Sequence, residues 1–205
     1  MFEINNISKS YKNKQILNNV SLRVNQGEAI GILGTNGSGK STLLNCIAGE
    51  FADNRDFRVG YVPQDNPLFD ELKPVDNLRL WTDKNKSQIL KALSEPPLSD
   101  MNIIQFLDTP VKKMSGGMKK RLSIASVLIN NPSVLLLDEP FAALDLVAKQ
   151  DILSFMKNFL QSGGYIIVAS HDEAIFDFCN HVYLLKNGSL IDTKSETNYL
   201  ELLRN

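Results

Sequence analysis

The sequence predicts an α/β fold in which helices flank a mainly parallel β-sheet. Three short apolar runs carry this prediction, namely Ala29–Leu33, Ser133–Asp138 and Tyr165–Ala169. Each run is continuously apolar, as in strands buried on both faces of a parallel sheet. Segments with helical spacing separate the runs, and this alternation is typical of an α/β domain.

The N-terminal part predicts a small antiparallel β-subdomain. Residues Phe2 to Ser8 roughly alternate apolar and polar side chains, and Ile16 to Val24 give a second strand of the same kind. A turn at Gln26-Gly27-Glu28 leads into the buried strand Ala29–Leu33. A helix is expected from Ser41 to Gly49.

The middle of the chain predicts a helical insertion. A strand from Phe57 to Val62 stops at Pro63. Proline-rich breaks then separate three segments with helix-like spacing, which are Val75–Trp81, Lys86–Leu93 and Met101–Leu107. We expect one domain over residues 1–205, in which 65–114 form an inserted helical subdomain and 1–64 and 111–205 form the core.

The C-terminal part continues the alternation of helix and strand. Besides the two buried strands already named, the expected elements are helices at Met118–Ile129, Val147–Gln161, Glu173–Phe178 and Tyr199–Leu203, and a hairpin of Val182–Leu185 with Leu190–Thr193. The dipeptide Asn187-Gly188 is a strong signal for the hairpin turn.

Composition excludes several classes of protein. The 205 residues include 22 basic and 23 acidic side chains, a formal charge of −1, so we expect no direct binding of nucleic acid driven by bulk charge. The two cysteines, Cys46 and Cys179, form no metal-type cluster. No apolar run approaches the ~18 residues that span a bilayer, so any membrane-spanning part must come from another chain.

The stretch from Gly34 to Thr42 fits the P-loop pattern G-x-x-x-x-G-K-[ST] between a strand and a helix. Its glycines allow backbone N–H groups to approach a triphosphate, and the following helix points its positive end at the same anion. The residues expected to hold the nucleotide are Gly34, Asn36, Gly37, Ser38, Gly39, Lys40, Ser41 and Thr42. Lys40 supplies a cation near the β- and γ-phosphates, and the Ser41 hydroxyl is placed to ligate Mg²⁺.

Two acids and a histidine follow other buried strands, at the carboxyl edge of the sheet where ligands bind. Asp138 is expected to reach Mg²⁺, and Glu139 to activate or orient the attacking water. His171 suits a donor to the γ-phosphate. Taken alone, an Asp-Glu pair is more often a helix N-cap, and a histidine at a strand end is usually structural. The P-loop in the same chain favours the catalytic interpretation of the acid pair, and the position of His171 near the same crevice favours a role there.

For two further residues and one motif, a functional and a purely structural interpretation are both open. Gln64 offers an amide oxygen to Mg²⁺ or water, and Tyr11 a ring on which a base can stack, but each also suits a loop or turn. The guanine-reading N-K-x-D pattern is missing, which favours adenine. Ser115-Gly116-Gly117 opens a helix and is either an anion site or an ordinary N-cap; the residues alone leave this open.

The set of motifs, in this order, resembles the ATP-binding cassette (ABC) ATPases, the motor subunits of ABC transporters. Tyr11 is similar to the adenine-stacking aromatic residue of that family. Gly34 to Thr42 is similar to its Walker A loop, and Gln64 to its Q-loop.

The same resemblance continues through the second half of the chain. Met114 to Met118 is similar to the signature motif, and Leu135 to Glu139 to Walker B with the catalytic acid. Ala142 to Asp145 is similar to the D-loop, and His171 to the switch histidine.

The resemblance implies a head-to-tail dimer that closes on ATP and opens after hydrolysis. Ser115, Gly116 and Gly117 of one subunit would contact the γ-phosphate bound to the other, with Asp145 near the same seam. The second subunit would be the same chain or a related one. Transmembrane permease subunits would dock at the helical subdomain and the Gln64 region, which implies a cytoplasmic protein peripheral on the inner face of the cell membrane.

Three departures from the family pattern stand out. Met118 replaces the usual glutamine of the signature, and Ala142 replaces a common serine of the D-loop. The interval from Lys40 to Gln64 is short, which suggests a trimmed β-subdomain. Alternatives to a transporter motor are a soluble ABC ATPase of ribosomes or DNA, and a nucleotide-binding scaffold without hydrolysis; intact Glu139 and His171 argue against the second.

Overall fold

The structure is a computed structural model that describes residues 1–51, 54–65, 67–171 and 177–193. The expected helix at 199–203 lies outside these residues, and the one at 173–178 lies largely outside them, so both stay predictions. Within the described residues, no helix is long and apolar enough to cross a membrane.

The central sheet has six strands in the order β4-β5-β6-β3-β7-β8. The strands are β3 (Ala29–Leu33), β4 (Val59–Val62), β5 (Val134–Asp138), β6 (Tyr165–Ala169), β7 (His181–Lys186) and β8 (Ser189–Asp192). The first five in spatial order are parallel, and β8 pairs antiparallel with β7 through the expected hairpin. In its turn, Asn187 and Gly188 both have positive φ, of 51° and 78°.

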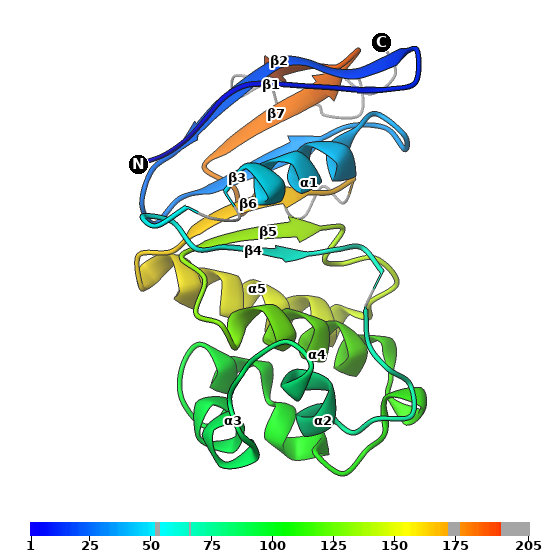
Figure 1. The fold of residues 1–205 in the computed structure, drawn as a ribbon, viewed down its shortest axis with the longest axis vertical. Helices are drawn as coiled ribbons and strands as arrows, with labels where there is room; N and C mark the ends of the chain where they lie inside the picture. The colour runs from blue at the N-terminus through cyan, green and yellow to red at the C-terminus, as the bar shows by residue number, and fades with distance from the viewer. Residues whose placement is uncertain (52–53, 66, 172–176, 194–205) are drawn as a thin grey trace.

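The N-terminal strands β1 (Phe2–Tyr11) and β2 (Lys14–Val24) form a separate antiparallel two-stranded sheet. They lie over the same side of the central sheet as helix α1 (Lys40–Glu50), as Figure 1 shows. The predicted combination of a mainly parallel sheet, a small antiparallel sheet and a set of inserted helices is confirmed.

Alternating residues of the buried strands feed two hydrophobic cores. On β5, Leu136 packs with α1 and the β1–β2 sheet, whereas Leu135 and Leu137 pack with helices on the opposite face. Those helices are α4 (Gly116–Leu128) and α5 (Leu146–Gln161). Because both faces are covered, the strands are apolar throughout, which is the pattern that predicted them.

The segment between β4 and α4 is helical, and it packs on the outer side of α4 (Figure 1). It contains α2 (Pro74–Arg79) and α3 (Lys86–Leu93). The helix expected at Met101–Leu107 is wrong: the chain there forms two short 3₁₀ turns, Leu98–Met101 and Ile103–Phe106. Asn102, with φ 50°, stands between them in the left-handed region and interrupts the helix that the apolar spacing suggested.

Candidate active site

The loop between β3 and α1 turns sharply beside the sheet. Gly37 and Gly39 have φ of 79° and 106°, a backbone conformation that residues with a side chain rarely adopt. A β-carbon at Gly39 would also lie 2.9 Å from Ile16 Cγ2. Gly39 is the N-cap of α1 and offers no side-chain cap, and the first N–H groups of a helix have no acceptor within it. The loop therefore presents backbone donors and the positive end of α1 to one place.

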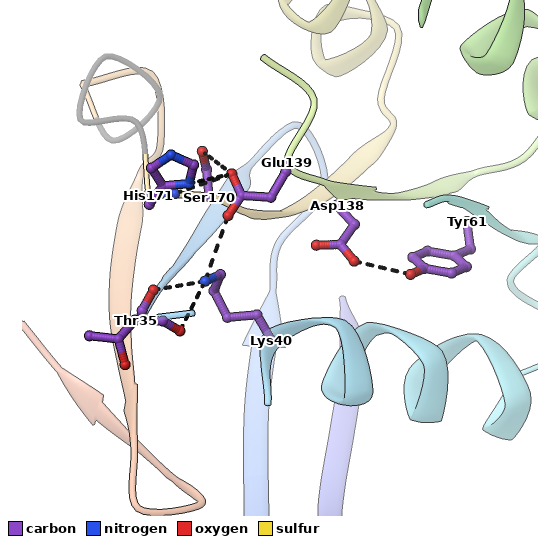
Figure 2. A network of polar contacts seen from close by, with 8 residues as sticks. Thr35, Lys40, Tyr61, Asp138, Glu139, Ser170 and His171 are labelled. Carbon is purple, nitrogen blue, oxygen red and sulfur yellow. Dashed lines mark hydrogen bonds and ion pairs between the residues drawn. The ribbon is translucent and has the colours of Figure 1, made fainter. Parts of the chain in front are cut away.

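Lys40 extends its side chain back across this loop. Its Nζ donates to the carbonyl oxygens of Gly34, at 2.7 Å, and Thr35, at 3.4 Å. The same nitrogen lies 3.6 Å from Glu139 Oε1, and both side chains are buried (Figure 2). The β3–α1 loop and the end of β5 are thus joined by an ion pair.

Glu139 lies at the centre of a polar network at the carboxyl edge of the sheet. Its Oε2 lies 2.9 Å from His171 Nδ1 and accepts from Ser170 Oγ, at 3.2 Å, and from the His171 backbone N–H, at 3.4 Å. The backbone of Glu139 has φ 46°, an uncommon conformation for a non-glycine residue. The His171 ring is 61% exposed, whereas the carboxylate is buried. Figure 2 shows this network, in which a buried acid is held by a largely exposed histidine.

The two carboxylate oxygens of Asp138 differ in their hydrogen bonding. Tyr61 Oη donates to Oδ2 at 3.2 Å. Oδ1 is buried, and no hydrogen-bond partner for it occurs among the described residues. Burial, and then the negative charge of Asp138, raise the pKa of the Tyr61 hydroxyl, so it stays protonated and remains a donor. A buried carboxylate oxygen without a donor fits a hard divalent cation such as Mg²⁺.

A cavity of about 350 Å³ brings most of the predicted residues together. It is lined by Tyr11, Ile16, Asn36, Gly37, Gly39, Lys40, Ser41, Thr42, Gln64, Asp138 and Glu139. Gly34 reaches this set through its carbonyl contact with Lys40, and His171 through Glu139. Tyr11 is 56% exposed, and Lys9 Nζ lies over its ring, 5.6 Å from the ring centroid.

Four predicted residues lie elsewhere, at the facing N-terminal ends of α4 and α5. Ser115 Oγ accepts from the Met118 backbone N–H at 3.2 Å, and Asp145 Oδ1 from that of Ala148 at 2.8 Å. Both act as N-caps, the plainer interpretation of Ser115. Gly116 and Gly117 face this same region, and a β-carbon on Gly117 would lie 2.8 Å from Ala148 Cβ. None of the four lines the cavity.

The sequence analysis missed several residues that form hydrogen bonds to the predicted site residues or to their partners. Tyr61 and Ser170 contact Asp138 and Glu139, and Asn45 contacts Tyr61. Lys120 on α4 is 2% exposed, and its Nζ donates to the carbonyl oxygens of Gln64, at 3.0 Å, and Pro63, at 3.5 Å. Burial lowers the Lys120 pKa despite the opposing charges of nearby aspartates.

We expect Lys120→Ala to destabilise the protein by about 2 kcal/mol, because it removes the donor to two carbonyl oxygens and leaves a cavity. Chemical denaturation would measure the free energy of unfolding. The neighbouring Lys119→Ala is the matched control. Lys119 is 31% exposed, and its ammonium forms a surface ion pair with Asp70 at 3.4 Å, its one ion pair within the described part of the chain. Its loss should therefore change stability by less than about 1 kcal/mol. Equal effects of the two variants would contradict the assignment.

Comparison with known proteins places this geometry in a family. The family model described as "ABC transporter" matches residues 17–142, more than half of the chain. This chain belongs to the ABC transporter family. The match spans both the P-loop and the two acids at the end of β5, the two parts that the ion pair of Lys40 and Glu139 joins.

Individual proteins similar to this ABC family member are also ATP-binding proteins of transport or export systems. It is 33% identical to the lantibiotic transport ATP-binding protein SrtF of Streptococcus pyogenes, over 89% of this chain and 87% of that one. It is 30% identical to the lipopolysaccharide export system ATP-binding protein LptB of Haemophilus influenzae, over 92% and 88%.

A solved structure gives the same result for the fold. The dimeric post-hydrolysis state of the ATP-binding cassette MJ0796, bound to ADP and Pi, superposes with a TM-score of 0.77. The two chains are 26% identical, and the superposition covers 92% of this chain and 95% of that one. The resemblance to ABC ATPases is therefore confirmed.

Proposed function

We propose that this chain is the ATP-binding and ATP-hydrolysing motor subunit of a membrane ABC transporter. The observation that carries the proposal is the single cavity in which the β3–α1 loop, Lys40, Asp138 and Glu139 meet. Backbone donors and a buried cation suit the phosphates of ATP, and buried acids beside them suit a metal and an attacking water. The named relatives of this chain are ATP-binding proteins of transport and export systems.

Each side chain of the cavity has a role in this proposal. The loop residues and Lys40 bind the phosphates, and Tyr11 stacks on the adenine. Asp138 Oδ1, with Ser41 and Gln64, would hold Mg²⁺, which supplies positive charge to the phosphate oxygens when bound. Since ATP brings several negative charges to Lys40, the amine can exchange its loop carbonyls for phosphate oxygens.

The hydrolytic step is assigned to Glu139 and His171. Glu139 accepts the proton of the attacking water at a carboxylate oxygen, and oriented donors hold that carboxylate. His171 Nδ1 and Ser170 Oγ both contact Glu139 Oε2, so the histidine can orient this carboxylate. The exposed part of the imidazole ring can face the γ-phosphate.

A dimer completes the proposed site. Ser115, Gly116 and Gly117 lie outside the cavity of their own chain, at a helix N-terminus suited to an anion. In a head-to-tail pair they would meet the γ-phosphate held by the partner, with Asp145 at the same seam. Because ATP would bind the closed pair more tightly than the open one, it would shift the equilibrium toward closure, and hydrolysis would let the pair open.

The partner on the membrane side is proposed to dock beside the helical insertion, residues 65–114. A mostly apolar hollow of about 440 Å³ lies there, between β4 and α4. Trp81, which is 42% exposed, Pro63, and Val127 contribute to its lining. The hollow is adjacent to Gln64, so a helix seated in it could couple to the nucleotide cavity. This arrangement would hold the chain at the inner face of the cell membrane.

Co-purification tests this proposal against the soluble alternative. The tagged chain would be recovered from detergent-solubilised membranes of its source cell, and its partners identified by mass spectrometry. We expect transmembrane permease subunits, together with ATPase activity in the recovered complex. Recovery with ribosomes or DNA, without a permease, would contradict the transporter assignment. Recovery with a permease but without ATPase activity would favour a non-hydrolysing scaffold.

A further inference from the structure

Tyr61 on β4 touches a carboxylate that belongs to the proposed metal site. In the sheet, Tyr61 pairs with Leu136, and Asp138 is two residues further along β5 on the same face. The tyrosine therefore reaches Asp138 diagonally, and its Oη lies 3.2 Å from Oδ2, as Figure 2 shows. This face is the one that α1 covers, so Tyr61 lies between the P-loop helix and β5.

The direction of this hydrogen bond is fixed by the neighbouring helix. Asn45 Nδ2 lies 2.8 Å from the Ser41 carbonyl oxygen, which can only accept, so the amide turns its NH₂ group to that side. The same nitrogen lies 3.3 Å from Tyr61 Oη and donates to it. The hydroxyl hydrogen is then left for the carboxylate, which is also only an acceptor.

This hydrogen bond determines which carboxylate oxygen of Asp138 is available to bind a metal ion. Oδ2 receives a charge-assisted hydrogen bond, whereas Oδ1 is buried with no partner among the described residues. Rotation of the carboxylate would break the bond to Tyr61. The carboxylate is thus held with one defined oxygen free, as a metal site with a fixed ligand geometry requires.

We propose that Tyr61 is a positioning residue for the divalent cation of this ATPase, which holds Asp138 so that Oδ1 is presented to the metal. The inference rests on the proposed function. It goes beyond it because Tyr61 does not line the cavity and has no role among the proposed nucleotide or metal ligands. The chain of contacts from Ser41 through Asn45 and Tyr61 to Asp138 ties two proposed metal ligands together from behind.

The test is Tyr61→Phe, which removes one oxygen and keeps the ring in its apolar surroundings. Mn²⁺ would be titrated into the full-length protein saturated with a non-hydrolysable ATP analogue, with free Mn²⁺ followed by its EPR signal. Loss of such an outer contact typically weakens metal binding by 10–100-fold, so we expect the Mn²⁺ dissociation constant to rise about tenfold. The Mg²⁺ concentration for half-maximal ATPase should rise in parallel. Affinity for the analogue in EDTA should change less than about twofold, because no phosphate contact is lost.

The control is Tyr165→Phe, on β6 of the same sheet, whose hydroxyl accepts only from the N-terminal amine, at 3.4 Å, among its described hydrogen bonds. It should leave Mn²⁺ binding unchanged. Unaltered Mn²⁺ binding in Tyr61→Phe would overturn the inference, as would an equal loss of affinity for the analogue with and without metal, since that would indicate a merely structural role. If the wild type neither hydrolyses ATP nor binds Mn²⁺ with the analogue, the proposed function fails instead.

Discussion

Replacing Glu139 by glutamine should lower ATP turnover by about 10²–10⁴-fold, the contribution typical of a general base, while ATP still binds. Glutamine keeps the size of the side chain, so the loop and the cavity should persist. It cannot take a proton from water at neutral pH. Phosphate release measured at saturating ATP would give the loss in kcat.

The same variant should accumulate as an ATP-bound dimer, because closure on ATP remains possible but the step that reopens the pair is slowed. Size-exclusion chromatography with light scattering, with and without ATP, would detect it. Glu71→Gln is the matched control, since Glu71 is 77% exposed and forms a surface ion pair with Lys112. Turnover close to wild type in Glu139→Gln would remove Glu139 from its assigned role.

The second large effect is expected for Lys40→Ala, which should weaken ATP binding about 100-fold, equivalent to about 2.7 kcal/mol. The variant loses a buried ammonium whose hydrogen bonds to phosphate would be charge-assisted. It also leaves Glu139 without its nearby cation, so two negative groups would face each other when ATP enters. Calorimetric titration of ATP would measure the dissociation constant.

Lys157→Ala provides the comparison for this experiment. Lys157 is an exposed lysine on α5, so its removal should leave ATP affinity unchanged. Circular dichroism would check that both variants fold. Unchanged ATP affinity in Lys40→Ala would mean that the β3–α1 loop does not bind the phosphates in the proposed way.

Much of the fold could be predicted because its strands are short, continuous apolar runs. Burial on both faces of a sheet demands such runs wherever they occur along the chain, and β3, β5 and β6 were found in this way. The Met101–Leu107 segment failed because spacing alone does not distinguish an α-helix from two 3₁₀ turns. Asn102 in the left-handed region decided between them.

In the candidate site, too, some residues could be predicted from local spacing in the sequence and others could not. Local spacing was enough to predict a glycine loop at Gly34 to Thr42 between a strand and a helix, because the P-loop pattern lies within nine consecutive residues. It was also enough to predict that Asp138, Glu139 and His171 lie near one another, since strand ends meet at one edge of a parallel sheet. By contrast, Lys120 and Tyr61 contact their partners across 56 and 77 positions of the chain, and no local pattern marks them.

The sequence by itself determined the α/β class, the glycine loop between β3 and α1, and the order of the acids and the histidine, because each depends on neighbours along the chain. The tertiary structure alone decided the ion pair of Lys40 with Glu139, the unpartnered oxygen of Asp138, and the placement of Ser115 to Gly117 outside the cavity. These features depend on sheet register and helix packing, which bring together side chains that are distant in sequence. Close contacts between such side chains set the polarity and charge of the site, and thus the chemistry it can support.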